Sequence, residues 1–160
     1  MFGLSKIFGD RRSSVCAPMT GILHPIEEAP DEVFAGKMMG DGFFIEPSLP
    51  LVVAPGNGEV VMIADAAHAI GMKLSIGAEI LLHMGIDTVE LDGRGFEVLV
   101  QTGQKVKAGD PLMRVDLPYI RKHAKSDVCL VVFTGGEQVT LTNKGEVEAG
   151  TQIASLQYTI

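Results

Sequence analysis

The chain has 160 residues, a formal net charge of −7, 19 glycines, two cysteines and no tryptophan. This length suffices for one domain with a substantial hydrophobic core, and the acidic balance argues against nonspecific nucleic-acid binding, which needs a basic surface. No apolar run approaches the roughly 20 residues that span a bilayer, and the N-terminus lacks a signal-peptide pattern. We therefore expect a cytoplasmic protein in which Cys16 and Cys129 are free thiols, although a single disulfide between them stays open.

The N-terminal segment, residues 1–14, differs in character from the rest of the chain. It combines apolar side chains within one third of a helical wheel with positive charge, namely Leu4, Ile7, Phe8, Lys6, Arg11 and Arg12. Such a segment can make weak peripheral contact with an anionic membrane through residues 1–12. The alternative is a disordered tail. The sequence thus divides into an N-terminal tail, 1–14, and one domain, 15–160.

From residue 15 onward, short apolar runs separated by Gly and Pro turns are typical of β-strands. The clearest alternation places Glu79, Leu81 and His83 on one face of an expected strand. The runs that carry the strand prediction are 15–26, 43–45, 51–55, 58–65, 79–85, 96–106 and 129–136.

Helical pieces are expected only near residues 65–70 and 117–122, the second with Asp116 at its N-terminus. Two late segments, 102–117 and 143–157, share the pattern V-x-A-G-x-x-(I/L), and each is predicted to form a strand, a Gly turn and a second strand. The predicted fold class is all-β: an antiparallel β-sandwich or barrel with Gly-rich hairpins and one or two short helical turns.

Two histidines, His68 and His83, bracket a stretch whose midpoint falls on Ser75 and Ile76, in a short break flanked by glycine. If the stretch folds there as an antiparallel hairpin, the two imidazoles lie directly opposite each other, with Cβ atoms about 4.5–5.5 Å apart. A lone strand histidine is usually structural, but paired imidazoles suit phosphoryl transfer or metal binding.

His83 is the better nucleophile of the pair. A neutral imidazole has a nucleophilic nitrogen near pH 7. Phosphoryl acceptance requires an acceptor that holds the other ring nitrogen, and donors that meet the added charge. The carbonyl of Gly85 is a natural acceptor, and His68 is a natural donor.

The motifs HAIG at 68–71, EILLHMGIDTV at 79–89 and FAGKMMGDG at 34–42, with the late Gly-rich segments, resemble the IIA domain of the glucose family in the bacterial phosphoenolpyruvate-dependent sugar phosphotransferase system. The resemblance covers roughly residues 15–158. It implies an antiparallel β-sandwich that is a phosphotransferase component and needs no cofactor.

The resemblance also implies a relay. A histidine-containing phosphocarrier protein would phosphorylate His83 at Nε2, and the group would pass to a cysteine on the IIB domain of a membrane sugar permease. His68 would support the phosphoryl group. Regulated transporters or metabolic enzymes are further implied partners of the unphosphorylated form.

Family members dock partners on an apolar patch with an acidic rim. The matching patch residues are Phe34, Met38, Met39 and Val89, and the matching rim residues are Asp31 and Asp87. Alternatives stay open: one of the two methionines belongs to the core, and Asp31 is a turn or cap residue. Asp41, in the turn Gly40-Asp41-Gly42, is interpreted as structural.

One departure from the family pattern concerns position 66. Family members usually carry a threonine there, and its hydroxyl joins the hydrogen-bond network on the phosphate side. Ala66 cannot donate a hydrogen bond, so this role does not carry over.

Two other classes compete with the phosphocarrier. His68 and His83 could bind zinc, adventitiously or as part of a zinc-binding β domain, but a site needs further ligands and no His-x-His pair is present. Lys37 in GKMMG could mark a biotinyl or lipoyl carrier, although such domains are about half this size. His24 and His123 are interpreted as solvated surface residues.

Overall fold

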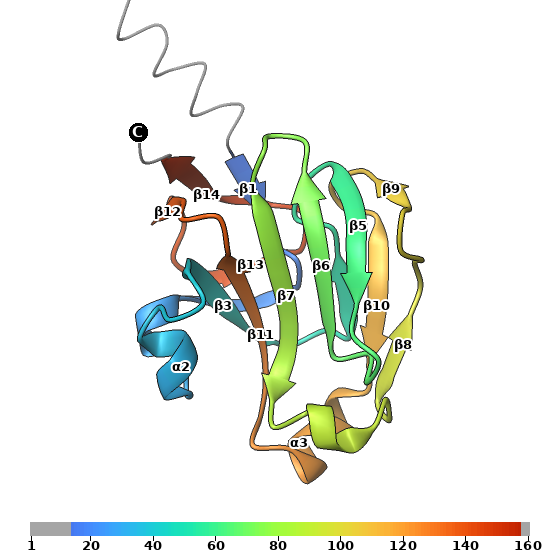
Figure 1. Ribbon diagram of the computed structural model, residues 1–160. Helices are drawn as coiled ribbons and strands as arrows, with labels where there is room; N and C mark the ends of the chain where they lie inside the picture. The colour runs from blue at the N-terminus through green and yellow to red at the C-terminus, as the bar shows by residue number, and fades with distance from the viewer. Residues whose placement is uncertain (1–13, 158–160) are drawn as a thin grey trace, which may run out of the picture.

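The computed structural model describes residues 14–157, and its strands form one large and two small sheets (Figure 1). The main sheet has eight strands in the order β13-β2-β3-β11-β7-β6-β5-β9, and the two three-stranded sheets have the orders β1-β14-β12 and β4-β10-β8. The strands are β1 (Ser14–Cys16), β2 (Gly21–Pro25), β3 (Asp41–Pro47), β4 (Leu51–Val53), β5 (Gly58–Ile63), β6 (Ala69–Leu74), β7 (Glu79–Ile86), β8 (Phe96–Val98), β9 (Lys105–Val106), β10 (Pro111–Val115), β11 (Ser126–Phe133), β12 (Gln138–Leu141), β13 (Gly145–Val147) and β14 (Gln152–Gln157).

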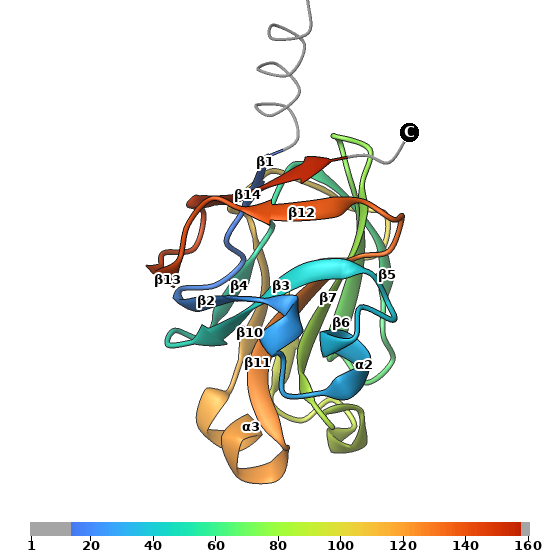
Figure 2. The same ribbon diagram turned by 90° about the vertical axis from the view of Figure 1, so that its left-hand side faces the viewer.

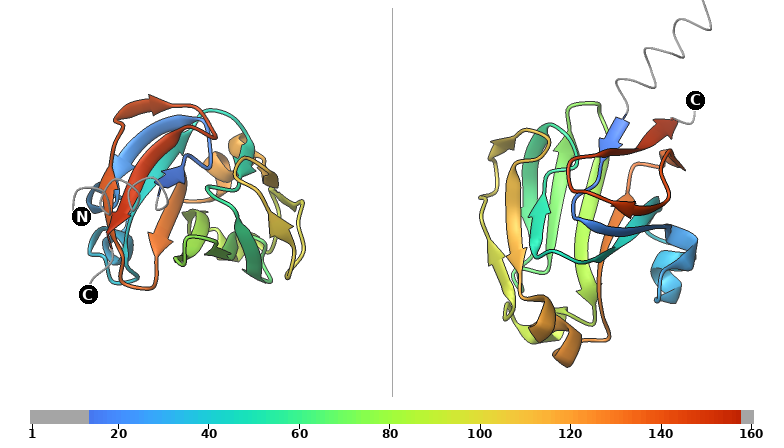
Figure 3. Two further views of the ribbon diagram at one scale, coloured as in Figure 1. Left: turned by 90° about the horizontal axis from the view of Figure 1, so that it is seen from above. Right: turned by 180° about the vertical axis from the view of Figure 1, so that it is seen from behind.

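Every strand pairing in the described part of the chain is antiparallel. Seen from above, the sheets curve around a central core (Figure 3). The prediction of an antiparallel β-sandwich is therefore confirmed.

Helical structure is limited to α2 (Glu32–Ala35), α3 (Leu117–His123) and the 3₁₀ turns η1 (Ile26–Glu28) and η2 (Val89–Leu91). α3 confirms the second predicted helical piece, and Asp116 caps it by accepting a hydrogen bond from the amide of Tyr119 at 3.2 Å. The predicted helix near 65–70 is wrong. Residues 65–68 form a turn instead, and Ala69 already begins β6, whose cross-strand hydrogen bonds outweigh local helix propensity.

The two late repeats are strand–turn–strand units, as predicted, but they are not hairpins. β9 pairs with β5 while β10 pairs with β4 and β8, and β13 pairs with β2 while β14 pairs with β1 and β12. Gly109 and Gly150 make the two turns with φ of 90° and 89°. Each repeat therefore carries the chain from one edge of the main sheet into a small sheet, because β9 and β13 are the two edge strands.

β11 is apolar on both faces and separates two hydrophobic clusters. Cys129, Val131 and Phe133 point into the main core between the sheets. The alternate residues point to a second, smaller cluster on the face of the sheet on which α2 lies (Figure 2 shows α2). This cluster comprises Ile26, Phe34, Phe44, Ile86, Val128, Leu130 and Val132. This second cluster holds α2 beside β7.

Both cysteines in the described residues are free thiols, as predicted. Burial raises the pKa of the Cys129 thiol to about 12, so it is inert as a nucleophile. No helix in residues 14–157 is both long and apolar enough to cross a membrane. The predicted tail and its membrane contact lie outside the described residues, except that Ser14 is the first residue of β1.

A close approach between β3 and β11 generates a prediction about stability. A Cβ at Gly42 would collide with the backbone carbonyl of Val131, so we expect Gly42→Ala to lower the free energy of unfolding by at least about 3 kcal/mol. Gly56→Ala is the matched control, since a Cβ there would meet only Leu74 methyl groups, at 3.5 and 3.7 Å. Denaturant titration of both variants measures the difference, and equal stability would contradict the assignment of this contact.

Candidate functional site

His83 lies in the middle of β7 on the outer face of the main sheet. Its cross-strand neighbours are Ala69 on β6 and Leu130 on β11. Two rings flank the imidazole: the Phe34 ring from α2 has its centroid 5.1 Å away, and the His68 ring stands nearly perpendicular with its centroid 5.0 Å away. The structure therefore brings together the two histidines that the sequence singled out.

The predicted pairing of the histidines is wrong by one residue. The β6–β7 turn does fall at residues 75–77, but His83 is directly opposite Ala69. His68 is opposite Met84, whose amide donates a hydrogen bond to the carbonyl of His68 at 2.7 Å. In a continuous strand, His68 and Ala69 would point to opposite faces. Ala67 has a φ of 64°, so the chain turns just before the strand begins, and the ring of His68 lies beside His83 rather than behind the sheet.

The carbonyl of Gly85 fixes the tautomer of His83. The Nδ1 of His83 lies 3.0 Å from this oxygen, and because a carbonyl only accepts, Nδ1 carries the proton. The lone pair of the neutral ring is then on Nε2. The carbonyl acceptor predicted from the sequence is confirmed.

Thr88 supports the hydrogen bond between His83 and Gly85. It was not predicted from the sequence as a site residue. It is buried, and its hydroxyl donates a hydrogen bond to the carbonyl of Met84 at 2.5 Å. Gly85 has a φ of 76°, and a Cβ there would collide with the Thr88 side chain. The tight turn from Met84 to Thr88 thus aims the Gly85 carbonyl back at His83. The sequence signal was the threonine within GIDTV.

Burial and the neighbouring His68 keep His83 uncharged. Burial is the main reason that the pKa of His83 falls from 6.5 to about 4, and His68 lowers it as well, whereas the hydrogen bond to Gly85 and the Asp31 carboxylate act in the opposite direction. Burial also lowers the pKa of His68. Both imidazoles are therefore neutral at physiological pH.

The four predicted patch residues differ in exposure. Met38 is 77% exposed, Val89 58% and Met39 37%, whereas Phe34 is only 7% exposed and belongs to the second cluster. The alternative that one methionine lies in the core is wrong, because both follow the end of the short helix α2 and face outward. Phe34 faces inward and supports the ring of His83 from the side.

The two rim residues also differ. Asp31 is the N-cap of α2 and accepts hydrogen bonds from the amides of Val33 and Phe34, at 3.1 and 3.3 Å. It therefore fixes the helix that carries Phe34 and also contributes negative potential at His83. Asp87 is exposed in the turn after β7, with a φ of 61°.

Position 66 lies in the turn that precedes His68. The Nδ1 of His68 is buried and makes no hydrogen bond with residues 14–157. Ala66 has only a methyl group and cannot form a hydrogen bond with this nitrogen through its side chain.

The geometry gives little support to a zinc site at the two histidines or to a carrier lysine at position 37. The described residues contain no group of three or more His, Cys, Asp or Glu side chains that could hold a metal ion, and the two imidazoles alone are fewer ligands than zinc sites use. Lys37 is not at a hairpin tip, as a carrier lysine would be. It follows α2 and forms ion pairs with Glu27 at 3.7 Å and Asp41 at 3.6 Å.

Asp41 and His24 both have structural surroundings. Asp41 begins β3, and its carboxylate accepts hydrogen bonds from the amides of Gly42 and Val139 at 2.8 and 2.9 Å, which supports the structural interpretation. The prediction that His24 is simply a solvated surface residue is wrong. Its ring stacks on Phe44 with a centroid distance of 4.8 Å and is flanked by carboxylates.

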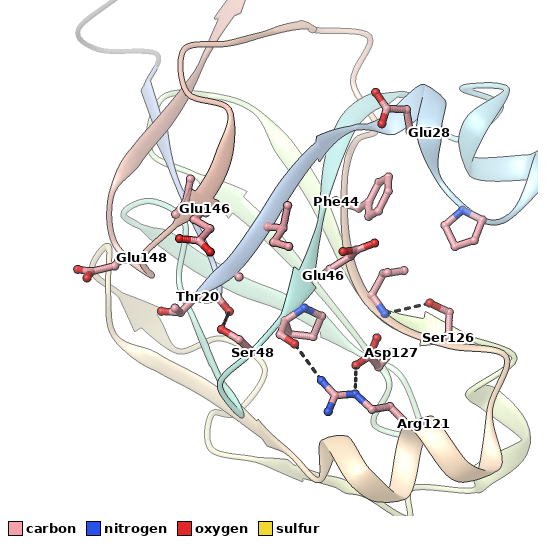
Figure 4. Close-up of a pocket in the computed structure, with 16 residues that line it drawn as sticks. Thr20, Glu28, Phe44, Glu46, Ser48, Arg121, Ser126, Asp127, Glu146 and Glu148 are labelled. Atoms are coloured by element: carbon pink, nitrogen blue, oxygen red, sulfur yellow. Dashed lines mark hydrogen bonds and ion pairs between the residues drawn. The ribbon is translucent and has the colours of Figure 1, made fainter.

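A separate pocket is shown in Figure 4. It has a volume of about 930 Å³ and is lined by β2, β3, β11 and β13, without either site histidine. Its arginine, Arg121, is already held by Asp127 at 2.6 Å and by the carbonyl of Pro47 at 3.0 Å. An atom that exchanges a group with another protein must lie on an accessible surface, which favours the histidine pair over this pocket as the functional site.

The anchor at Thr88 generates a prediction. Thr88→Val keeps the shape of the side chain but removes its hydrogen bond to Met84, so we expect a loss of about 1–2 kcal/mol in the free energy of unfolding and a mixed tautomer of His83. The ¹⁵N shifts of the His83 ring nitrogens measure the tautomer. Thr140→Val, at an exposed position in β12, is the control. An unchanged pure Nδ1–H tautomer in Thr88→Val would show that Thr88 does not position Gly85.

The lowered pKa of His83 predicts its behaviour with pH. Its folded pKa of about 4 lies below its ordinary value of 6.5, so protons bind the unfolded chain preferentially. The stabilising contribution of neutral His83 is present above pH 6.5 and is lost as the pH falls toward 4. An NMR titration should give a midpoint near pH 4 for His83, and His83→Gln should flatten the decline of stability in this window. A midpoint at or above pH 6.5 would contradict the burial of this ring.

Comparison with known proteins identifies the family of this chain. A family model described as phosphoenolpyruvate-dependent sugar phosphotransferase system, EIIA 1, matches residues 13–139. Relatives from two strains of Staphylococcus epidermidis, each named PTS system glucose-specific EIIA component, are 45% identical over 149 residues, which cover 90% of this chain and 90% of each relative. The solved structure of glucose permease IIA from Mycoplasma capricolum matches with a TM-score of 0.83 and 42% identity, covering 88% of this chain and 93% of that one. The chain therefore belongs to the EIIA 1 family of the phosphoenolpyruvate-dependent sugar phosphotransferase system.

Proposed function

We propose that this protein is a cytoplasmic phosphocarrier that accepts a phosphoryl group on Nε2 of His83 during sugar uptake. The observation that carries the proposal is the hydrogen bond from His83 Nδ1 to the carbonyl of Gly85, which leaves the Nε2 lone pair as the nucleophile. Because two relatives are named glucose-specific, we propose that the sugar taken up by means of this phosphoryl transfer is glucose.

The donor we propose is a histidine-containing phosphocarrier protein. Its phosphorus–nitrogen bond breaks as a new bond forms between phosphorus and Nε2 of His83, and the donor imidazole leaves neutral. The phosphorylated ring of His83 then carries a positive charge, because Nδ1 keeps its proton. The Gly85 carbonyl stabilises this charge through the existing hydrogen bond, without reorganisation.

His68 has a supporting role in this proposal. Its ring stands beside that of His83, and its buried Nδ1 has no acceptor among the described residues. Since a buried N–H without an acceptor is costly, we assign the proton of His68 to Nε2, from which it donates to the phosphoryl oxygens. Ala66 supplies no hydroxyl to reinforce this donor, so His68 acts with fewer partners than in relatives that have a threonine there.

The acceptor we propose is a cysteine thiolate on the IIB domain of a sugar permease. The bond from phosphorus to Nε2 breaks as a bond from phosphorus to sulfur forms, and His83 returns to its neutral Nδ1–H state. Both partners dock on the exposed side chains of Met38, Met39 and Val89, with Asp31 and Asp87 attracting basic residues.

A regulatory role follows from the same surface. A phosphoryl group carries a charge of about −1.5 to −2 at pH 7, and on His83 it would lie in the middle of the apolar patch. Binding of transporters or metabolic enzymes to this patch is therefore expected only in the unphosphorylated state.

The test uses purified upstream enzyme, phosphocarrier protein and labelled phosphoenolpyruvate. We expect the wild-type chain to take up one acid-labile phosphate, His83→Gln to take up none, and His68→Gln to be labelled but to transfer the label to a IIB domain at least about 100-fold more slowly. His123→Gln is the control, because this ring is exposed and stacks on Tyr119 at 4.2 Å. Full labelling of His83→Gln would refute the assignment.

A further inference from the structure

The pocket of Figure 4 is a groove on the outer face of β13, β2, β3 and β11, and its volume is about 930 Å³. The strand registers place Glu146, Ile22 and Glu46 next to one another across it. Ile22 is 40% exposed, whereas its neighbour Leu23 points into the main core. Together with Phe44, Ile22 gives the groove an apolar floor. An apolar side chain can therefore bury area on this floor.

Negative charge borders the apolar floor. The lining residues, all of which belong to the described part of the chain, include a single cation, Arg121, which already pairs with Asp127 at 2.6 Å. Within residues 14–157, Glu146 and Glu148 form no ion pair, so their charges are available to a ligand. The lining carboxylates are Glu28, Glu46, Asp127, Glu146 and Glu148, and we name the pocket that they define the acidic groove.

The N-terminal tail of this chain has a composition that complements the acidic groove. The chain as a whole has a net charge of −7, but the tail is basic and apolar. Its basic side chains are Lys6, Arg11 and Arg12, against one acidic residue, Asp10, and its large apolar side chains include Phe2, Leu4, Ile7 and Phe8. A basic, apolar segment matches an acidic, apolar groove in both charge and hydrophobicity.

The tail also begins close enough to the groove to enter it. Thr20, which lines the groove, lies six residues after Ser14, and its hydroxyl accepts a hydrogen bond at 3.0 Å from the amide that follows Glu148. Phe8 lies six residues before Ser14, and each of these two stretches spans at most about 22 Å. A reversal of the chain at Ser14 would therefore bring Phe8 to the end of the groove where Figure 4 shows Thr20 and Glu148. Residues 1–7 can then extend along the groove.

We propose that the N-terminal tail, residues 1–13, docks in the acidic groove of its own chain. In the docked state the apolar side chains of residues 4–8 cover Ile22, and the cations of the tail lie beside Glu146 and Glu148. Because the tail is tethered to β1, its effective concentration at the groove is in the millimolar range. A contact of weak intrinsic affinity therefore suffices to hold the tail there, and salt weakens this contact by screening its charges.

Docking of the tail would compete with the membrane contact that its sequence predicts. An anionic membrane and the acidic groove attract the same cations, and each would bury the same apolar side chains. The tail cannot occupy both surfaces at once. The acidic groove would therefore make the membrane contact of the tail weaker than the sequence of the tail alone suggests.

The experiment measures paramagnetic broadening of amide NMR signals in the full chain. A nitroxide is attached to the thiol that Ser5→Cys introduces, and Cys16→Ser removes the half-buried thiol of the chain. Cys129 can stay, because it is buried and inert. We expect the amide signals of Ile22 and Glu46 to lose far more intensity than those of exposed residues outside the groove.

Two charge-reversed variants of the spin-labelled chain test the role of the groove. Glu146→Lys/Glu148→Lys should restore most of the lost intensity, because the lysines repel the cations of the tail. Glu90→Lys/Glu97→Lys is the matched control, since it makes the same charge change at two exposed residues that do not line the groove. The control variant should keep the loss of intensity.

Each other result would overturn the inference. Full intensity of Ile22 and Glu46 in the spin-labelled chain would show that the tail does not lie in the groove. Equal losses in the two charge-reversed variants would show that the carboxylates of the groove do not hold the tail. A mixture of ¹⁵N-labelled chain without nitroxide and unlabelled chain with nitroxide tests for docking on a second copy: an equally large loss there would contradict docking within one chain, and full intensity supports it.

Discussion

The arrangement of the site depends on one hydrogen bond, from Nδ1 of His83 to the carbonyl of Gly85. The two groups belong to residues only two apart, so the backbone must turn sharply immediately after the histidine. Glycine supplies the positive φ that this turn needs, and the buried hydroxyl of Thr88 closes it against Met84. The short segment from His83 to Thr88 therefore determines that Nδ1 of His83 carries the proton.

The same histidine must be exposed enough to meet a partner and buried enough to stay neutral. Strand β11, which is apolar on both faces, allows both conditions to be met. Its inward residues pack in the main core, while its outward residues carry the second cluster, on which α2 and Phe34 rest. The Phe34 ring then packs beside the ring of His83, with the two centroids 5.1 Å apart. Burial of the ring among these residues is the main reason that the pKa of His83 is lowered.

The sequence predicted those features that depend on local patterns. Alternation identified β7, the Asp116 cap identified α3, and the Gly-rich pattern identified the turns of both repeats. The predictions failed where the pairing is not local. The repeats could not reveal that their strands enter different sheets, and spacing alone could not reveal that the turn at Ala67 delays the start of β6 by one residue. The orientation of Phe34 was equally out of reach, because a four-residue helix is oriented by what it packs against.

In the proposed function, the reactive atom, Nε2 of His83, lies on an apolar surface and not in the pocket of Figure 4. A small substrate is best held by a cavity, but a protein partner needs a nearly flat surface with the reactive atom at its centre. The exposed side chains of the predicted patch are Met38, Met39 and Val89, and the flexible thioether of methionine can adapt to partners of different shape. In the proposed function, a phosphoryl group on His83 adds a charge of about −1.5 to −2 to this surface at pH 7. Under that proposal, the transferred charge disfavours the apolar contacts that brought the donor, and the donor is released.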